Sequence, residues 1–256
     1  MSRTRPTLLT ALTLAVVALS ATTNPEARPA APLPVLAASS LATVFPQIDK
    51  TPRYSFAGSD TLAAQIKLGA PADVFAAASS SSPDKLYAQG LVEKPVVFTT
   101  NRLVLVTPAS NPVGISSVFD LRKTGIKLVI GTQSVPIGVY TRTILRNLAL
   151  TSVLSNVVSQ ETDVRSILGK VALGEADAGF VYRTDAKTVT GKVEVIALPA
   201  WAQPPVRYEI AVVKSTGNRA AAVAYVNKVL SRAGQAKLRA AGFGAVKHGV
   251  TRYVGG

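Results

Sequence analysis

Short apolar runs alternate with helical patterns along most of this 256-residue chain. Apolar runs bounded by turn signals are typical of buried strands, and apolar residues that recur every three or four positions indicate helices. We expect strands at residues 33–38, 54–57 and 72–77, and helices at residues 41–50 and 61–68. Strands and helices in this alternation predict a parallel sheet with helices on both faces.

The same pattern begins again in the second half. Residues 96–106 are rich in β-formers, with an interruption at residues 99–101. Further strands are expected at residues 127–132, 177–182, 193–198 and 207–213, and helices at residues 136–148, 164–173 and 218–240, the last stopping at Gly242. Two similar α/β units, with a strand and a helix left over, suggest a chain that crosses between two lobes and returns. We expect a ligand in the cleft between them, beyond the carboxyl ends of strands.

The composition excludes several classes of site. There is no cysteine, which removes disulfide scaffolds, thiolate zinc sites, iron–sulfur clusters and cysteine nucleophiles. His248 is the only histidine, so a histidine metal cluster is excluded as well. With 48% hydrophobic and 16% charged residues, the chain is expected to be globular with a sizeable core.

The N-terminus has the pattern of a secretory signal. Arg3 and Arg5 precede an apolar run at residues 8–21, and Ala18 and Ser20 suit a cleavage site. The run is shorter than the roughly 20 residues of a membrane span, although an uncleaved anchor is the alternative. Residues 22–34 are proline-rich and read as a leader. Because no cysteine is available for lipid attachment, we expect a soluble protein in the periplasm or at the cell exterior.

The chain is strongly basic, with 28 Lys and Arg against 14 Asp and Glu and a net charge of +14. Such a field raises the association rate of anions, and it could equally hold the protein on an anionic surface or on nucleic acid. The basic residues are spread thinly, without the interleaved aromatic residues of single-strand binders. We therefore expect a solvated cationic surface and no nucleic-acid partner.

Four loops lie where an expected strand leads into a helix, at residues 37–40, 57–61, 133–138 and 161–164, and they carry small or hydroxylated residues. Helix N-termini leave backbone N–H groups unpaired and carry about half a positive charge, which makes them natural oxyanion sites. A serine at a helix start is also an ordinary cap, so each loop taken singly is a weak signal. Several loops that converge on one point would form a neutral anion cage.

Six segments share motifs with a known family: residues 35–41, 56–66, 69–76, 135–140, 163–165 and 178–186. The run Gly-Ala-Pro-Ala-Asp-Val-Phe at residues 69–75 is specific when it occurs together with Val-Pro-x-Gly and Val-Tyr-x-x-Asp-Ala. From about residue 35 to residue 243 the chain resembles the molybdate-binding proteins of molybdate ABC importers, within the type II periplasmic or extracellular solute-binding proteins.

The resemblance implies an α/β, bilobal type II periplasmic-binding-protein fold, in which two parallel-type lobes joined by a hinge close on a tetrahedral dianion in a central cleft. Residues 1–31 would be signal peptide and leader, residues 32–104 with 208–256 lobe one, and residues 105–207 lobe two. The implied function is capture of molybdate or tungstate and delivery to an ABC permease with its ATPase subunit. We expect a monomer with no cofactor and no metal.

The resemblance also assigns ligand groups to particular residues. The family's first serine falls on Ser40, its backbone donor after Val-Pro falls on Ile137, its backbone donor between Asp and Arg falls on Val164, and its tyrosine falls on Tyr182. Each has an ordinary structural alternative, because Ile137 and Val164 also suit plain helix starts and Tyr182 also suits the end of a buried strand.

At one position the chain departs from the family, since the serine before Thr-Leu falls on Asp60. Like unit charges about 4 Å apart repel by roughly 4 kcal/mol at an effective dielectric near 20, and a dianion doubles this cost. Three explanations stay open. Asp60 caps its own helix, with only its N–H facing the ligand while Ser59 supplies the hydroxyl; burial keeps Asp60 protonated; or the ligand carries a proton that Asp60 accepts, as hydrogen phosphate would.

Two rival functions remain in view. An enzyme is not expected, because no Gly-x-Ser-x-Gly elbow or P-loop is present, and the serines at residues 79–82 read as a loop and helix start. A secreted cationic protein that binds a polyanion is the second rival. Its affinity would fall steeply with salt, whereas a desolvated cage for one anion predicts weak salt dependence and one-to-one stoichiometry.

Overall fold

The computed structural model describes Met1, residues 31–246 and residues 252–254. The predicted apolar signal run at residues 8–21 and His248 lie outside the described residues. Within the described part, no helix combines the length and apolar character that crossing a membrane requires.

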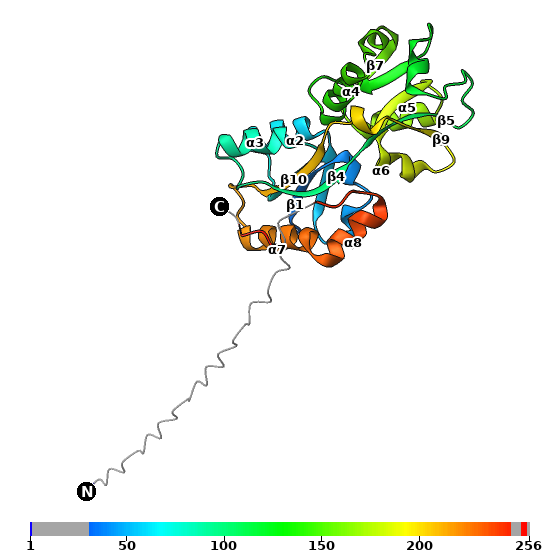
Figure 1. Ribbon diagram of the computed structural model, residues 1–256. Coiled ribbons are helices and arrows are strands. Elements are labelled where there is room, and N and C mark those ends of the chain that lie inside the picture. The colour runs from blue at the N-terminus through cyan, green and yellow to red at the C-terminus, as the bar shows by residue number, and fades with distance from the viewer. Residues whose placement is uncertain (2–30, 247–251, 255–256) are drawn as a thin grey trace. The chain divides into compact units, whose positions relative to one another are not determined.

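The first sheet has the order β2-β1-β3-β10-β4. The three N-terminal strands run parallel, and β10 pairs antiparallel with both β3 and β4. Helices cover both faces, with α2 and α3 on one side and α7 and α8 on the other (Figure 1). The elements are β1 (Pro34–Ala38), η1 (Ser39–Leu41), α1 (Phe45–Ile48), β2 (Arg53–Ala57), α2 (Ser59–Lys67), β3 (Val74–Ala77), α3 (Ser81–Ala88), β4 (Val96–Asn101), β10 (Val206–Val212), α7 (Arg219–Leu230) and α8 (Arg232–Ala241).

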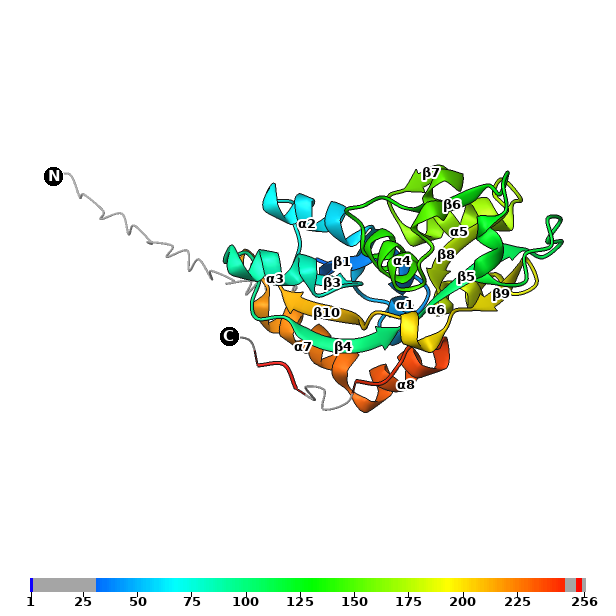
Figure 2. The ribbon, with the colours of Figure 1, turned by 45° about the horizontal axis from the view of Figure 1, so that its top comes forward.

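The second sheet has the order β7-β6-β8-β5-β9, and Figure 2 shows it with its helices beside the first. Strands β6, β7 and β8 are parallel, while β5 pairs antiparallel with β8 and β9. Its elements are β5 (Leu103–Pro108), η2 (Val118–Arg122), β6 (Leu128–Gly131), α4 (Pro136–Asn147), η3 (Thr151–Asn156), β7 (Val157–Glu161), α5 (Val164–Ala172), β8 (Ala178–Tyr182), α6 (Arg183–Ala186), η4 (Lys187–Val189), β9 (Val193–Ala197) and η5 (Ala200–Ala202).

The two sheets define two lobes, which we call the first and the second lobe. The chain leaves the first sheet at Asn101 and enters the second at Leu103, and it returns at Val206, which pairs with Asn101. The two segments that connect the lobes therefore lie side by side, and this arrangement is suited to a hinge. The bilobal α/β expectation is confirmed, and the two antiparallel additions, β5 and β10, follow from the crossings. The lobe limits at residues 104 and 207 stay a prediction.

Two predicted helices differ from the structure. The helix expected at residues 218–240 is two helices, because Ser231 ends α7 and caps α8 by accepting a hydrogen bond from the Gly234 amide at 3.1 Å. The helix expected at residues 41–50 is a short 3₁₀ turn followed by the single-turn α1, with Pro46 in its first turn. Gly242 ends α8 at φ 100°, as expected for a left-handed helix stop.

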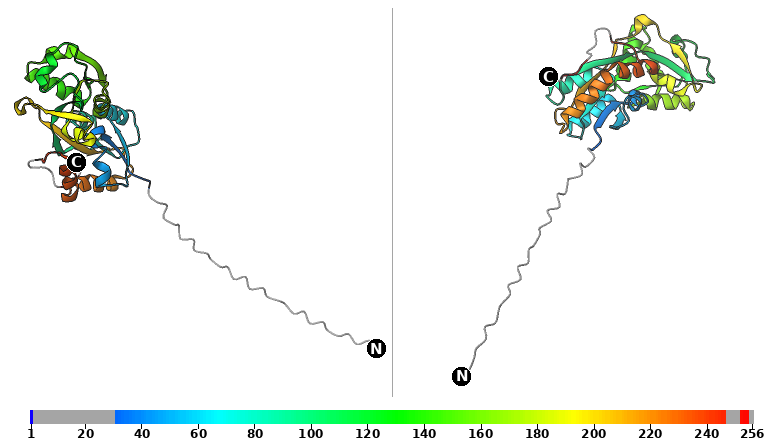
Figure 3. Two further views of the ribbon diagram at one scale, coloured as in Figure 1. Left: turned by 90° about the vertical axis from the view of Figure 1, so that its right-hand side faces the viewer. Right: turned by 90° about the horizontal axis from the view of Figure 1, so that it is seen from below.

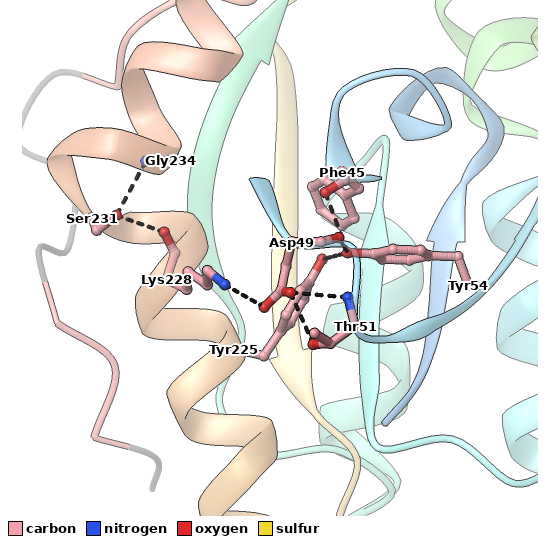
Figure 4. Close-up of polar contacts among 8 residues, drawn as sticks. All are labelled: Phe45, Asp49, Thr51, Tyr54, Tyr225, Lys228, Ser231 and Gly234. Carbon is pink, nitrogen blue, oxygen red and sulfur yellow. Dashed lines mark hydrogen bonds and ion pairs between the residues drawn. The ribbon is translucent and has the colours of Figure 1, made fainter. Parts of the chain in front are cut away.

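A polar cluster fastens α7 to the N-terminal part of the first lobe (Figure 4). Lys228 Nζ lies 2.7 Å from Asp49 Oδ2, and the Tyr54 hydroxyl donates to the Asp49 carbonyl at 2.8 Å. Burial of the Asp49 carboxyl opposes its ionisation, but hydrogen bonds from Lys228 and Thr51 outweigh burial and lower its pKa. The returning C-terminal segment, shown from two more sides in Figure 3, is thereby joined to the strands that begin the fold.

Candidate functional site

Six strand ends converge on one small cavity between the lobes. Strands β1, β2 and β3 of the first sheet and β6, β7 and β8 of the second all lead into its lining at their carboxyl ends. The cavity has a volume of about 20 Å³, and one water molecule requires roughly 10–15 Å³. The carboxyl ends of strands are the position at which α/β sheets bind ligands.

Five of the six predicted site residues line this cavity. Ser40 and Ser59 come from the first lobe, and Ile137, Val164 and Tyr182 come from the second. Each is at most 7% exposed. The fold thus brings together residues that are up to 142 positions apart in the sequence. All five have uncharged side chains, and several lie at the starts of helices. Their role as ligands remains a prediction.

The backbone geometry of two second-lobe helices supplies amide donors. Pro136 opens α4 and has no N–H, so Ile137 offers the first amide of that helix. Asp163 caps α5, and its Oδ1 accepts from the amides of Arg165 at 2.8 Å and Ser166 at 3.2 Å. Because Asp163 satisfies the second and third amides, the amide of Val164 is the one left to face the cavity.

The Ser59 hydroxyl is positioned as a donor. Ser59 is the first residue of α2, and its Oγ accepts a hydrogen bond from the Ala78 amide at 3.0 Å. A serine oxygen that accepts from the backbone keeps its own hydrogen free to donate. This hydrogen is available to an acceptor inside the cavity.

Ser40 belongs to a chain of buried polar groups that leads to the hinge. Asn101 Nδ2 donates to Thr184 Oγ1 at 2.9 Å and to the Tyr208 hydroxyl oxygen at 3.4 Å, and the Tyr208 hydroxyl lies 2.9 Å from Ser40 Oγ. A hydroxyl that accepts from Asn101 keeps its own hydrogen, so Tyr208 can donate to Ser40. With Tyr208 as the donor of this bond, the Ser40 hydrogen is free for the cavity that Ser40 lines.

For the oxyanion ligand that the sequence resemblance implies, replacing Tyr208 by phenylalanine is expected to weaken binding about tenfold, about 1.4 kcal/mol, because Ser40 loses its buried hydroxyl partner. Titration calorimetry with molybdate measures the change. Tyr54→Phe is the matched control, since the Tyr54 hydroxyl bonds only within the first lobe, to Phe45, Asp49 and Tyr225. An equal loss of affinity in both variants would contradict this role of Tyr208.

The Tyr182 hydroxyl is buried without a hydrogen-bond partner among the described residues. The residue is 1% exposed, and burial raises the pKa of its hydroxyl well above 10, so it remains a neutral donor. Buried polar groups are nearly always hydrogen-bonded, and an exception calls for a physical reason. An anion in the cavity would supply the missing acceptor.

The Asp60 side chain lies elsewhere. It lines a larger cleft of about 620 Å³ next to the small cavity, and its Oδ2 accepts a hydrogen bond from Ser134 at 2.7 Å. The explanation that Asp60 caps its own helix is wrong as far as its side chain is concerned, because α2 has Gly58 at its N-cap and no side-chain cap bond. The carboxylate instead accepts a hydrogen bond from the Ser134 hydroxyl of the opposite lobe, while Ser59 lines the small cavity.

The larger cleft is cationic. Lys67, Lys85 and Arg207 line it, and none of the three forms an ion pair within the described part of the chain. Pro136 borders both the cleft and the small cavity. Across residues 31–246 and 252–254 no cluster of three or more acidic or histidine side chains could hold a metal ion.

A buried carboxyl group, that of Asp185, lies near the cavity and only three positions after Tyr182 in the sequence. Asp185, in α6 directly after Tyr182, is 4% exposed, and its Oδ2 has no partner within the described residues. Burial raises its pKa to about 8. The positive charge of Arg165 lowers this pKa, and the negative charge of Asp163 raises it further. At neutral pH this group is mostly protonated and adds little negative charge near the site.

The raised pKa of Asp185 predicts a specific pH dependence of stability. Between about pH 4 and pH 8 the folded state holds a proton that the unfolded state releases, so this group lowers the free energy of unfolding as pH rises, by up to about 1.4 kcal/mol per pH unit. Asp185→Asn removes the effect. In urea unfolding from pH 5 to 8, the free energy of unfolding of the variant is expected to rise relative to that of the native protein with each pH unit. If the two free energies changed with pH in parallel, the assignment would be contradicted.

Two residues of the site, Tyr208 and Asn101, were missed by the sequence reasoning, and Ser134 was included only as part of the loop at residues 133–138. Tyr208 lies on an expected strand, and a tyrosine in a buried strand signals a hidden hydroxyl partner. The partner itself, Ser40, is 168 positions away and has no local signal. Asn101 was visible only as part of the interruption in the β-rich run at residues 99–101.

Comparisons with known proteins agree with this geometry. The model of the family described as bacterial extracellular solute-binding protein matches residues 35–244. The molybdate-binding protein ModA of Mycobacterium tuberculosis H37Rv is 37% identical over 252 residues, covering 92% of this chain and 95% of the relative. ModA of Haemophilus influenzae is 34% identical over 201 residues, covering 72% and 79%.

A solved structure shows the same fold. The periplasmic molybdate-binding protein of Azotobacter vinelandii superposes with a TM-score of 0.76 at 24% identity, covering 84% of this chain and all of the other. By their names, these three proteins bind molybdate. With a family match over most of its length and relatives above 30% identity, this chain belongs to the bacterial extracellular solute-binding proteins.

Proposed function

We propose that this protein captures a tetrahedral oxyanion, molybdate or tungstate, outside the cytoplasm and delivers it to the permease of an ABC importer. The observation that carries the proposal is the small cavity in which both lobes present uncharged donors, among them the Tyr182 hydroxyl, which has no hydrogen-bond partner among the described residues. The names of the ModA relatives support molybdate as the solute. The N-terminal signal pattern supports export, and the sequence contains no cysteine to which the lipid of a bacterial lipoprotein could be attached.

Neutral donors suit a dianion for energetic reasons. Removing water from a dianion costs tens of kcal/mol, so each oxygen needs donors in the site. Hydrogen bonds to a charged group return about 1.5–3 kcal/mol each, and the helix starts of α2, α4 and α5 add their positive ends. Donors at fixed positions also discriminate between anions of different size, because a smaller tetrahedral ion such as sulfate leaves some of the donors without an acceptor.

Titration calorimetry with molybdate, tungstate, sulfate and phosphate at two salt concentrations tests the proposal. We expect one molybdate or tungstate per chain at micromolar affinity or better, sulfate at least tenfold weaker, and a small effect of salt. Tighter binding of phosphate would favour a ligand whose proton Asp60 accepts. Many sites per chain with a steep salt dependence would favour the polyanion-binding alternative.

Delivery to a membrane permease requires release as well as capture, and hinge closure provides both. The paired crossings at Asn101 and Val206 allow one lobe to rotate against the other without breaking either sheet. We propose that the protein acts as a monomer, since the site is complete within one chain.

A further inference from the structure

Asp60 and Ser134 join the two lobes directly. Asp60 lies in the first turn of α2 in the first lobe, and Ser134 lies in the loop before α4 in the second lobe. The Ser134 hydroxyl donates to Asp60 Oδ2 at 2.7 Å. A hydrogen bond to a carboxylate is shorter and about twice as strong as one between neutral groups.

The bond connects the two segments that build opposite walls of the cavity. Asp60 follows Ser59 directly, and Ser134 precedes Ile137 by three positions, while Ser59 and Ile137 both line the cavity. Fixing Asp60 to Ser134 therefore fixes the start of α2 against the start of α4. The separation of these helix starts sets the width of the cavity.

The hydroxyl network around Ser134 strengthens its role as donor. Thr132 Oγ1 lies 3.2 Å from Ser134 Oγ. With its hydrogen directed to Asp60, Ser134 accepts the hydrogen of Thr132, so both hydroxyl groups are used. Both Asp60 and Ser134 line the larger cleft, and the second carboxylate oxygen of Asp60, Oδ1, is buried without a hydrogen-bond partner among the described residues.

We propose that Asp60 and Ser134 form an interlobe latch that favours the closed state, and that Asp60 is a positioning residue for the anion and not a ligand. The proposal rests on the proposed function for the identity of the anion. The latch itself is a contact between protein groups, so its effect on closure is measurable without any ligand.

Lobe separation measured by spin labels tests the latch in the free protein. Because the chain has no cysteine, Leu68→Cys and Val158→Cys introduce unique labels, one exposed position on each lobe. Asp60→Ala, Ser134→Ala and the double variant are each expected to shift the distance distribution toward the open state by the same amount. Ser134→Thr, which keeps the hydroxyl, is expected to restore the closed population.

The rate of molybdate release provides a second readout, because the two possible roles of Asp60 change this rate in opposite directions. Removing the Asp60 charge alone would strengthen binding of a dianion, whereas loss of the latch weakens it. We expect both single variants and the double variant to release molybdate about tenfold faster, without additivity. Ser155→Ala is the matched control, because the Ser155 hydroxyl bonds within its own lobe, to the Ser152 carbonyl at 2.9 Å.

Unchanged label distances in Ser134→Ala, tighter molybdate binding in Asp60→Ala, or additive effects in the double variant would each overturn the latch. Absence of molybdate binding by the native chain, with label distances that still respond to both substitutions, would overturn the proposed function and leave the latch standing.

Discussion

Replacing Gly58 by alanine is expected to reduce oxyanion affinity by about 100-fold to 1,000-fold while the fold stays intact. A Cβ at this position would meet the Thr162 carbonyl oxygen of the opposite lobe at well under 3.0 Å. The lobes would have to stay apart, and donors of one lobe would lose contact with the anion. Losing two hydrogen bonds to a charged ion, at about 1.5–3 kcal/mol each, gives an effect of this size.

The backbone of Gly58 does not itself require glycine. Its φ of −61° and ψ of 141° are accessible to any residue, so alanine causes no backbone strain, and within the first lobe its Cβ would meet only the Asp60 side chain closely, with Oδ1 at 3.0 Å. Calorimetric titration and thermal unfolding of the free protein measure the two effects separately. Gly169→Ala is the control, since a Cβ there meets nothing within 4 Å. A Gly58→Ala protein that binds as tightly as the native one would show that closure does not bring these segments together.

Replacing Tyr182 by phenylalanine is expected to weaken molybdate binding between about tenfold and 100-fold and to leave the free protein equally stable or slightly more stable. The hydroxyl has no partner in the described part of the protein, so its loss costs no internal hydrogen bond. In the complex the same substitution removes one donor to a charged ion. Titration calorimetry and urea unfolding report the two quantities.

Tyr225→Phe provides the opposite pattern as a control. Tyr225 is buried, its hydroxyl lies 3.3 Å from the hydroxyl of Tyr54 in the cluster of Figure 4, and it does not line the cavity. We expect it to lower stability without changing affinity. If Tyr182→Phe instead lowered stability and left affinity unchanged, the Tyr182 hydroxyl would belong to the core and not to the site.

Local sequence patterns predicted the parts of the site that depend on local structure. Strand ends followed by small or hydroxylated residues located the helix starts at Ser59, Ile137 and Val164, because strand, turn and helix signals all lie within a few positions of one another. The candidate loop at residues 37–40 already contained Ser40, the family resemblance added Tyr182, and the structure brings all five residues to one cavity.

Features that depend on a cap or on a sheet edge were harder to predict. The apolar spacing of residues 218–240 continues through Ser231, and only the serine side chain, which bonds Lys228 and Gly234, divides the helix. Strand β7 was missed because it is an edge strand whose residues are alternately half-buried and exposed, without a run of buried apolar residues. A Ser-x-x-Gly sequence after an apolar helix was the available signal for the break.

Contacts between distant segments could not be predicted from one sequence. The departure at Asp60 was visible, and its electrostatic cost could be calculated, but its partner Ser134 is 74 positions away in the other lobe. The same holds for the bond between Tyr208 and Ser40. Spacing within a motif carries no information on which hydroxyl of another lobe will meet a given carboxylate.

Diffraction from crystals grown with molybdate, recorded at the molybdenum absorption edge, locates the metal atom of the bound anion directly. The account predicts one anomalous peak inside the small cavity, with oxygens about 2.7–3.2 Å from the hydroxyls of Ser40, Ser59 and Tyr182 and from the amides of Ile137 and Val164. A peak in the cationic cleft lined by Lys67, Lys85 and Arg207, with the small cavity empty of molybdenum, would contradict it.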